Sequence, residues 1–277
     1  MSTQNALLTI LVEKINNDTL VLPTLPAIAL KVRKAADDPN INLNKMAEVV
    51  GQDPSLSARM IKISNSAYLG REVKVTSTAQ AVTRIGLAQV KNIATALAME
   101  QLFVSKNEVV KKYMAKRWTD IIDIVGNAMA TLMLYKKRNG AKHLSIDTMT
   151  LAALVADIGS LPVLTEAERH DSVFANPAFL DVAINKLAGR IGGSIMREWK
   201  FNEVFIECAE HWRNLEYVKP QVGYIDFVRV GAALSNLIED PQETLTRAGQ
   251  RGVFEDIDEL QSEEFIDLRE NAKGLFV

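Results

Sequence analysis

The chain has 277 residues, 48% of them hydrophobic and 24% charged, which is the composition of an ordinary globular protein of one large domain or two lobes. A formal net charge of −2 provides no basic field for nucleic acid, and no apolar run approaches the ~20 residues of a membrane span. A single cysteine and an N-terminus without a basic cluster favour a cytoplasmic protein that is not secreted and has no internal disulfide.

The first helices are predicted from apolar spacing and capping residues. Apolar residues recur at helical spacing over residues 6–15. The proline-containing segment that follows should be extended, and Pro26 should open a helix that reaches about Ala36. Asn42 and Asp53 are predicted N-caps of the next two helices.

A second group of helical patterns begins at Thr76-Ser77-Thr78, with a break predicted at Gly86 before a longer helix. Residues 118–134 then form a long apolar helix that ends in the basic cluster Lys136-Lys137-Arg138. This cluster suits a solvated helix C-terminus, and phosphate binding is the alternative.

The second half of the chain is also helical in pattern. A buried helix over residues 149–158 is predicted to stop at Gly159, and residues 165–177 read as a polar excursion. Glycines in the next helix suggest close backbone packing. Further helices are predicted over 181–199, 201–212, 224–238 and 258–271. Because no run of alternating strands appears, the predicted fold class is all-α.

Asp157 is the unusual residue of the buried central helix. Its neighbours Leu154, Val155 and Ile158 are apolar, and a carboxylate near a helix C-terminus faces the negative end of the helix dipole. A basic side chain, hydrogen-bond donors or a metal must therefore compensate its charge. From the residues alone we favour an aspartate tied to a loop amide or a basic side chain.

Four short motifs resemble known family signatures. The stretch Ala156-Asp157-Ile158-Gly159-Ser160-Leu161 resembles the His-Asp-Ile-Gly-Lys-Leu signature of the HD phosphohydrolase superfamily, with the histidine and the lysine replaced. Residues 22–27, 65–70 and 81–87 resemble the start and two signatures of the HDOD domain, the HD-related module of bacterial signalling proteins. The resemblance covers residues 18–235.

This resemblance implies a multi-helical HD-like bundle with an additional N-terminal helical lobe. The expected divisions are an N-terminal lobe over residues 1–105, a degenerate HD-like lobe over 106–240 and a C-terminal helical extension over 241–277.

The metal ligands of the HD family can be carried over position by position. Three of the six positions hold alanine, which has no donor atom, and the chain has only three histidines in total. A multi-histidine centre therefore cannot form, although the remaining three side chains could in principle hold one metal. The positions in chain order are Asp120, Ala156, Asp157, Ala188, His211 and Ala232.

We expect no metal and no cofactor. Instead, Asp157 should pair with His211, and Asp120 should be capped locally or paired with a lysine or arginine. The site should then be a small polar pocket at most, bounded by these three residues, and its carboxylates should repel a phosphate.

Three functions follow as alternatives. The leading hypothesis is a non-catalytic signalling or regulatory module that acts on a separate, unidentified protein, or senses a small ligand. Contact with that protein would involve a surface such as residues 65–70. The second is a metal-dependent phosphohydrolase acting on a nucleotide or cyclic dinucleotide, with Asp120, Asp157 and His211 as ligands. The third is a structural module that forms a homodimer through its N-terminal lobe.

Overall fold

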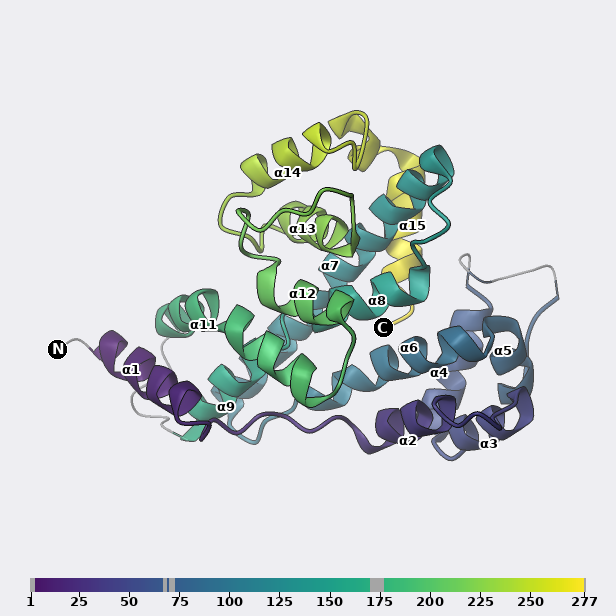
Figure 1. Cartoon of the computed structure of the whole chain (residues 1–277), viewed down its shortest axis with the longest axis horizontal. Helices are drawn as coiled ribbons and strands as arrows, with labels where there is room; N and C mark the ends of the chain where they lie inside the picture. The colour runs from purple at the N-terminus through teal and green to yellow at the C-terminus, as the bar shows by residue number, and fades with distance from the viewer. Residues whose placement is uncertain (1–2, 67–68, 70–72, 170–176, 277) are drawn as a thin grey trace.

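The computed structural model describes residues 3–66, 69, 73–169 and 177–276. Within these residues every regular element is a helix, which confirms the predicted all-α class. Figure 1 shows the helices as a bundle around a long central helix, with the N-terminal helix at the left edge and the C-terminal residues near the centre of the view.

The N-terminal helices begin where their capping residues predict. Asn42 Oδ1 accepts a hydrogen bond from the Lys45 amide at 3.0 Å, and Asp53 Oδ1 accepts one from the Leu56 amide at 2.9 Å. Gly86, with φ +89°, separates two helices as predicted. The elements are α1 (Thr3–Asn16), α2 (Ala27–Ala36), α3 (Leu43–Gly51), α4 (Pro54–Ser64), α5 (Thr78–Ile85), α6 (Leu87–Ala98) and η1 (Met99–Leu102).

The remaining elements include a helix that begins well before the predicted residue 118, because Asn107 caps its start by accepting from two backbone amides. They also include two helices, α9 and α14, that were not predicted. The elements are α7 (Glu108–Asn139), α8 (Ile146–Val155), α9 (Ser160–Arg169), α11 (Pro177–Glu198), α12 (Glu203–His211), α13 (Tyr224–Leu234), α14 (Pro241–Gln250), η2 (Ile257–Gln261) and α15 (Glu263–Lys273).

The polar excursion predicted from residue 165 is wrong for residues 165–169, which belong to helix α9. Pro162 lies in the first turn of α9, where its missing N–H would have no partner within the helix in any case. The segment Ile146–Arg169 is long and apolar enough to cross a membrane by length and composition, yet 89% of its most apolar window is buried inside the bundle. We therefore interpret it as the core of the fold.

Helix α7 organises the packing. It contacts α8, α13 and α15 along its length, while α6 packs against α8 and joins helices α2–α6 to the rest of the bundle (Figure 1). Helix α1 contacts α11, across the molecule from α2–α6. The predicted divisions at residues 105 and 240 stay a prediction.

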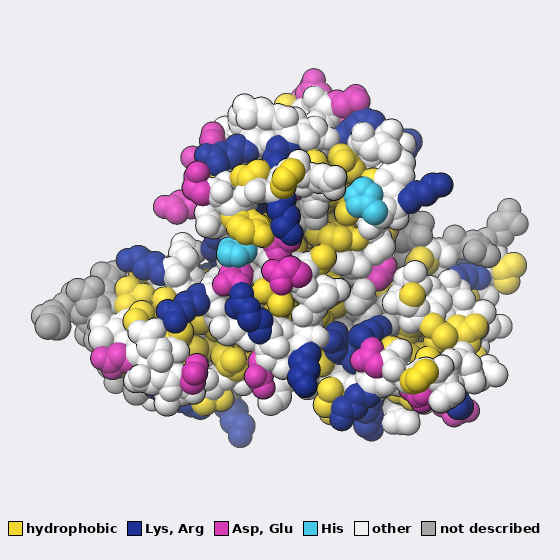
Figure 2. All heavy atoms as spheres, in the orientation of Figure 1, with side chains coloured by type: hydrophobic (Ala, Val, Ile, Leu, Met, Phe, Trp, Pro, Cys, Tyr) yellow, Lys and Arg dark blue, Asp and Glu magenta, His cyan; other side chains and the backbone are white. Residues whose placement is uncertain are grey.

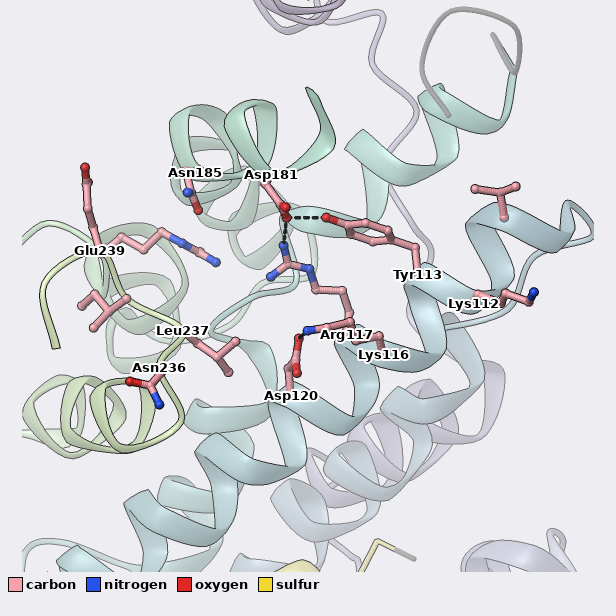
Figure 3. A pocket seen from close by; sticks show the side chains of 13 residues that line it. Lys112, Tyr113, Lys116, Arg117, Asp120, Asp181, Asn185, Asn236, Leu237 and Glu239 are labelled. Atoms are coloured by element: carbon pink, nitrogen blue, oxygen red, sulfur yellow. Dashed lines mark hydrogen bonds and ion pairs between the residues drawn. The ribbon is translucent and has the colours of Figure 1, made fainter. Parts of the chain in front are cut away.

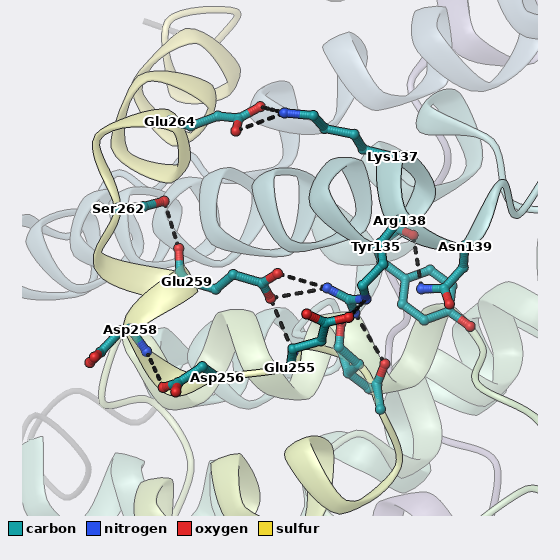
Figure 4. Close-up of polar contacts among 12 residues, drawn as sticks. Tyr135, Lys137, Arg138, Asn139, Glu255, Asp256, Asp258, Glu259, Ser262 and Glu264 are labelled. Atoms are coloured by element: carbon teal, nitrogen blue, oxygen red, sulfur yellow. Dashed lines mark hydrogen bonds and ion pairs between the residues drawn. The ribbon is translucent and has the colours of Figure 1, made fainter.

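The basic cluster at the end of α7 is part of the tertiary structure. Lys137 pairs with Glu264 at 2.8 Å, and Arg138 pairs with Glu259 at 2.8 Å while also donating to the Val253 carbonyl at 3.1 Å (Figure 4). These contacts fasten η2 and α15 to α7. Lys137 remains solvated as predicted, with 70% of its side chain exposed, whereas Arg138, at 19%, is held within the tertiary structure.

The surface mixes both signs of charge. Figure 2 shows acidic and basic side chains close to one another over the visible face, with hydrophobic side chains between them. The nearly equal numbers of basic and acidic residues, 32 and 34, agree with a surface on which neither sign dominates.

Gly159 acts through close packing and not as a simple helix stop. A Cβ atom added to it would lie 1.9 Å from the carbonyl oxygen of Ala188 and 2.6 Å from the backbone nitrogen of Gly192. Gly189 likewise faces the Glu210 carbonyl, which would lie 2.5 Å from an added Cβ. The predicted close approach of the α11 glycines is thus confirmed, and it draws α11 against both the α8–α9 turn and α12.

We predict that Gly159→Ala lowers the free energy of unfolding by about 3 kcal/mol, since backbone on a neighbouring helix must shift to admit the methyl group. Chemical denaturation measures this change. Gly51→Ala is the control, because an added Cβ there meets nothing within 4 Å. Equal stability of the two variants would contradict the packing argument.

Candidate functional site

Asp157 lies in the turn between α8 and α9 with 3% of its surface exposed. Ser160 fixes the turn, because its amide and its hydroxyl both donate to the Asp157 carbonyl, at 3.0 and 2.8 Å. The flanking Val155 and Ile158 are fully buried. An ionised carboxylate in these surroundings requires opposite charge nearby.

Two arginines supply that charge. Arg213 Nη2 donates to Asp157 Oδ1 at 2.6 Å, and Arg117 Nη1 lies 3.7 Å from Asp157 Oδ2. The two arginine side chains are 15% and 12% exposed, so little water screens either pair. Asp157 is therefore compensated by basic side chains, as the residues alone favoured. We call Arg117, Asp157 and Arg213 the arginine–aspartate cluster.

The predicted pairing of Asp157 with His211 is wrong. The His211 ring stacks on the Tyr217 ring, with centroids 4.0 Å apart and planes inclined by 11°. Helix α12 ends at His211, and the chain then turns so that Arg213 meets Asp157. A permanently charged guanidinium compensates a buried carboxylate better than an imidazole whose charge depends on pH.

Arg229 on α13 holds the loop that presents Arg213. Its guanidinium donates to four backbone carbonyls at 2.6–3.2 Å, those of His211, Trp212, Asn214 and Tyr217. The Arg213 guanidinium in turn lies 3.8 Å from the centroid of the Trp212 ring, which is fully buried. Arg213 is thus positioned by the loop backbone and by an aromatic face.

A second set of charges extends the cluster towards the surface. Arg117 Nη2 pairs with Asp181 on α11 at 3.0 Å, and the Tyr113 hydroxyl also donates to Asp181 (Figure 3). Asp120 pairs with Lys116, four residues earlier on the same helix, at 2.8 Å. The prediction that a lysine or arginine pairs with Asp120 is confirmed.

These side chains border a pocket of about 820 Å³. One face of α7 forms a wall with Tyr113, Lys116, Arg117 and Asp120 at helical spacing, and α11, Arg213 and residues 236–239 form the rest (Figure 3). The pocket is larger than predicted, and Asp157 and His211 are not among its lining residues. Basic and acidic side chains both line the pocket, so its carboxylates are not bare, and the repulsion of a phosphate stays a prediction.

The carried-over metal positions do not fit a metal. Ala156, Ala188 and Ala232 are at most 1% exposed and have no donor atom. Asp157 is already held by two cations, which would repel a divalent ion. Across the part of the chain that the structure describes, no group of three or more His, Cys, Asp or Glu residues is placed to hold a metal ion.

Sequence reasoning missed Arg117, Arg213 and Asp181. A signal for the two arginines existed, because Arg117 lies three residues before Asp120 and Arg213 lies two residues after His211, both of them carried-over positions. The family motifs upstream are structural where described. Asn65 exchanges hydrogen bonds with the Val75 backbone, both at 2.8 Å, and the rest of the surface proposed at 65–70 lies largely outside the described residues.

Burial and charge act in opposite directions on the two arginines. Burial lowers the pKa of Arg213, and the Asp157 charge only partly offsets it. Burial also acts to lower the pKa of Arg117, but Asp157, Tyr113 and Asp181 together raise that pKa overall. Both side chains remain charged near neutral pH because the ordinary pKa of arginine lies far above neutrality.

We predict that Asp157→Asn lowers the free energy of unfolding by about 3–5 kcal/mol, since buried Arg213 loses its anion and Arg117 keeps only Asp181. Asp120→Asn, which breaks an exposed i,i+4 pair, should cost less than about 1 kcal/mol and serves as the matched control. Chemical denaturation provides both values.

A double-mutant cycle tests the corrected pairing. Asp157→Asn and Arg213→Gln should couple by about 1 kcal/mol or more, whereas Asp157→Asn and His211→Ala should couple less. A stronger coupling to His211 would restore the pairing expected from the sequence.

Tyr113 gives a prediction that depends on pH. Burial and the hydrogen bond to Asp181 raise its pKa to about 12. Its contribution to stability is therefore complete below about pH 10, the ordinary tyrosine pKa, and is lost as the pH rises towards 12. In a tyrosinate absorbance titration, Tyr113→Phe should remove the last-titrating portion, and Asp181→Asn should move that portion to lower pH. An unchanged titration in Asp181→Asn would rule out the contact.

Comparison with known proteins agrees with this architecture. A solved protein from Shewanella amazonensis SB2B, with the name "Putative metal-dependent phosphohydrolase", is 38% identical, with a TM-score of 0.95 and full coverage of both chains. An HDOD domain protein of unknown function from Geobacter sulfurreducens is 18% identical, with a TM-score of 0.65 over 99% of each chain, and shows the same fold.

An uncharacterized protein from Treponema pallidum (strain Nichols) is 22% identical over 224 residues. That match covers 76% of this chain and 42% of the relative, so the chain spans less than half of that protein's length. The model of the HDOD domain matches residues 22–215, well over half of the sequence. The chain therefore belongs to the HDOD domain family.

Proposed function

We propose that this HDOD chain is a non-catalytic regulatory module, which acts on a separate signalling protein or senses a small ligand and does not hydrolyse phosphate esters. The observation that carries the proposal is the pairing of Asp157 with Arg117 and Arg213. In an HD hydrolase the corresponding aspartate would bind a cation that activates water. Here guanidinium groups take the place of that cation beside Asp157. They have no acceptor and no open coordination position, so they cannot bind and activate a water in the way a metal does.

The surroundings of the cluster favour the same proposal. Three carried-over ligand positions are buried alanines, and the close approach of Gly159 to Ala188 closes the space beside one of them. The adjacent pocket nevertheless stays open, with charged side chains of both signs on its walls. A pocket without a metal-binding group among the described residues, yet open to a polar molecule, suits recognition without turnover.

The second candidate is a metal-dependent phosphohydrolase acting on a nucleotide or cyclic dinucleotide. It is favoured by the name given to the Shewanella protein, which is 38% identical over its whole length. Asp120, Asp157 and His211 would be its ligands. To bind a metal, Asp157 would first have to release both arginines, and His211 would have to leave its stack on Tyr217.

Metal content and turnover distinguish the two candidates. For protein purified without chelator, we expect substoichiometric manganese, iron and zinc by elemental analysis. Hydrolysis of bis-p-nitrophenyl phosphate with added manganese should not exceed that of Asp157→Ala. Asp226→Asn is the matched control, because Asp226 is also buried and pairs with an arginine, Arg251, away from the pocket. Stoichiometric metal, with turnover lost in Asp157→Ala and kept in Asp226→Asn, would establish the hydrolase.

A further inference from the structure

A second pocket lies between helices α4–α6 and helices α7–α8. Its volume is about 270 Å³, just below the range of about 300–1,000 Å³ that small-molecule sites usually have. Its walls are mostly apolar, and each helix contributes at least one large hydrophobic side chain. They include Ile63, Ile85, Ile93, Met129, Ile146 and, from the C-terminal segment, Leu275. We call it the α6–α8 pocket.

One carboxylate lies in the wall of this pocket. Asp147 is the second residue of α8 and is 8% exposed. Its Oδ2 accepts a hydrogen bond from the Asn92 side-chain amide of α6 at 2.8 Å. Its Oδ1 accepts no hydrogen bond from the described residues, and this oxygen is accessible to solvent. This oxygen is therefore available to something that enters the pocket.

Asp147 differs from the other buried acids of the protein. The other four each pair with a lysine or an arginine. Asp157 pairs with Arg117 and Arg213, Glu166 with Lys14, Glu207 with Lys219, and Asp226 with Arg251. In the described part of the chain no basic side chain pairs with Asp147, and Asn92 brings a neutral amide.

The positive end of the α8 dipole offsets part of the Asp147 charge, because Asp147 lies in the first turn. The dipole acts on the whole carboxylate, however, and does not satisfy the free oxygen. A buried acid without a cation, open to an apolar pocket, is suited to receive a cation from outside.

We propose that the α6–α8 pocket binds a small ligand that has a protonated amine and an apolar body. The ammonium group would donate to Asp147 Oδ1, and the body would fill the space between the isoleucines and Met129. Anionic ligands are disfavoured because none of the described residues that line this pocket is basic. The site is separate from the arginine–aspartate cluster, so it does not depend on whether Asp157 binds a metal.

The position of the site gives such binding a means of regulation. Asn92 belongs to α6 and Asp147 to α8, so the hydrogen bond between them links helices α2–α6 to the rest of the bundle. A ligand held by Asp147 and by apolar side chains of both groups would change how strongly the two groups associate.

Phenethylamine is the probe, and phenethyl alcohol is its neutral counterpart of the same shape. Isothermal titration calorimetry on the full chain should show that the amine binds at least about tenfold more tightly than the alcohol, since only the amine forms a charge-assisted hydrogen bond. The chain has nine methionines, so ¹³C-methyl methionine spectra locate the binding. The Met129 resonance, assigned with Met129→Leu, should shift with the amine, whereas that of Met196 in α11 should not.

Asp147→Asn should weaken phenethylamine binding by about tenfold or more and leave the alcohol unaffected. Glu48→Gln, which removes an exposed charge on α3, is the control and should bind the amine as the unchanged protein does. Equal affinity for the amine and the alcohol in the unchanged protein would overturn the proposal without any variant. Absence of amine binding, or a Met129 resonance that stays in place while the amine binds, would overturn it as well.

Discussion

A negative charge in the middle of an apolar bundle is the constraint on which this structure depends. Asp157 is almost fully buried, and an isolated carboxylate there would cost far more than the fold could offset. Arg117 from α7 and Arg213 from the loop after α12 resolve this cost together. One buried acid thus fixes the relative positions of α7, the α8–α9 turn and the end of α12, and Arg229 anchors the loop that makes this possible.

The same rule explains how distant segments are joined. Glu166 on α9 receives Lys14 from α1, and Asp226 on α13 receives Arg251 at the end of α14. Each buried acid therefore connects its helix to another element. Asp147 is the exception, because its partner is the neutral amide of Asn92 and not a cation. This difference is the reason to infer that Asp147 binds a cation from outside.

The HDOD match ends at residue 215, but the site does not. Arg229 holds the loop of Arg213 from beyond that limit, and residues 236–239 close one side of the larger pocket. Leu275 likewise completes the smaller one. The residues after the family module are thus part of both candidate sites, and the ion pairs of Lys137 and Arg138 keep the C-terminal segment in place.

The sequence by itself determined the all-α class, most helix starts, the family and the expectation that Asp157 needs a partner, because periodicity, capping and motifs are local properties. Only the tertiary structure decided which partner it has. His211 and Arg213 are two residues apart, and the direction of the chain after α12 determines which side chain meets Asp157. The pockets were likewise not predictable, because their walls come from helices far apart in sequence, whose distances depend on contacts such as Gly159 against Ala188.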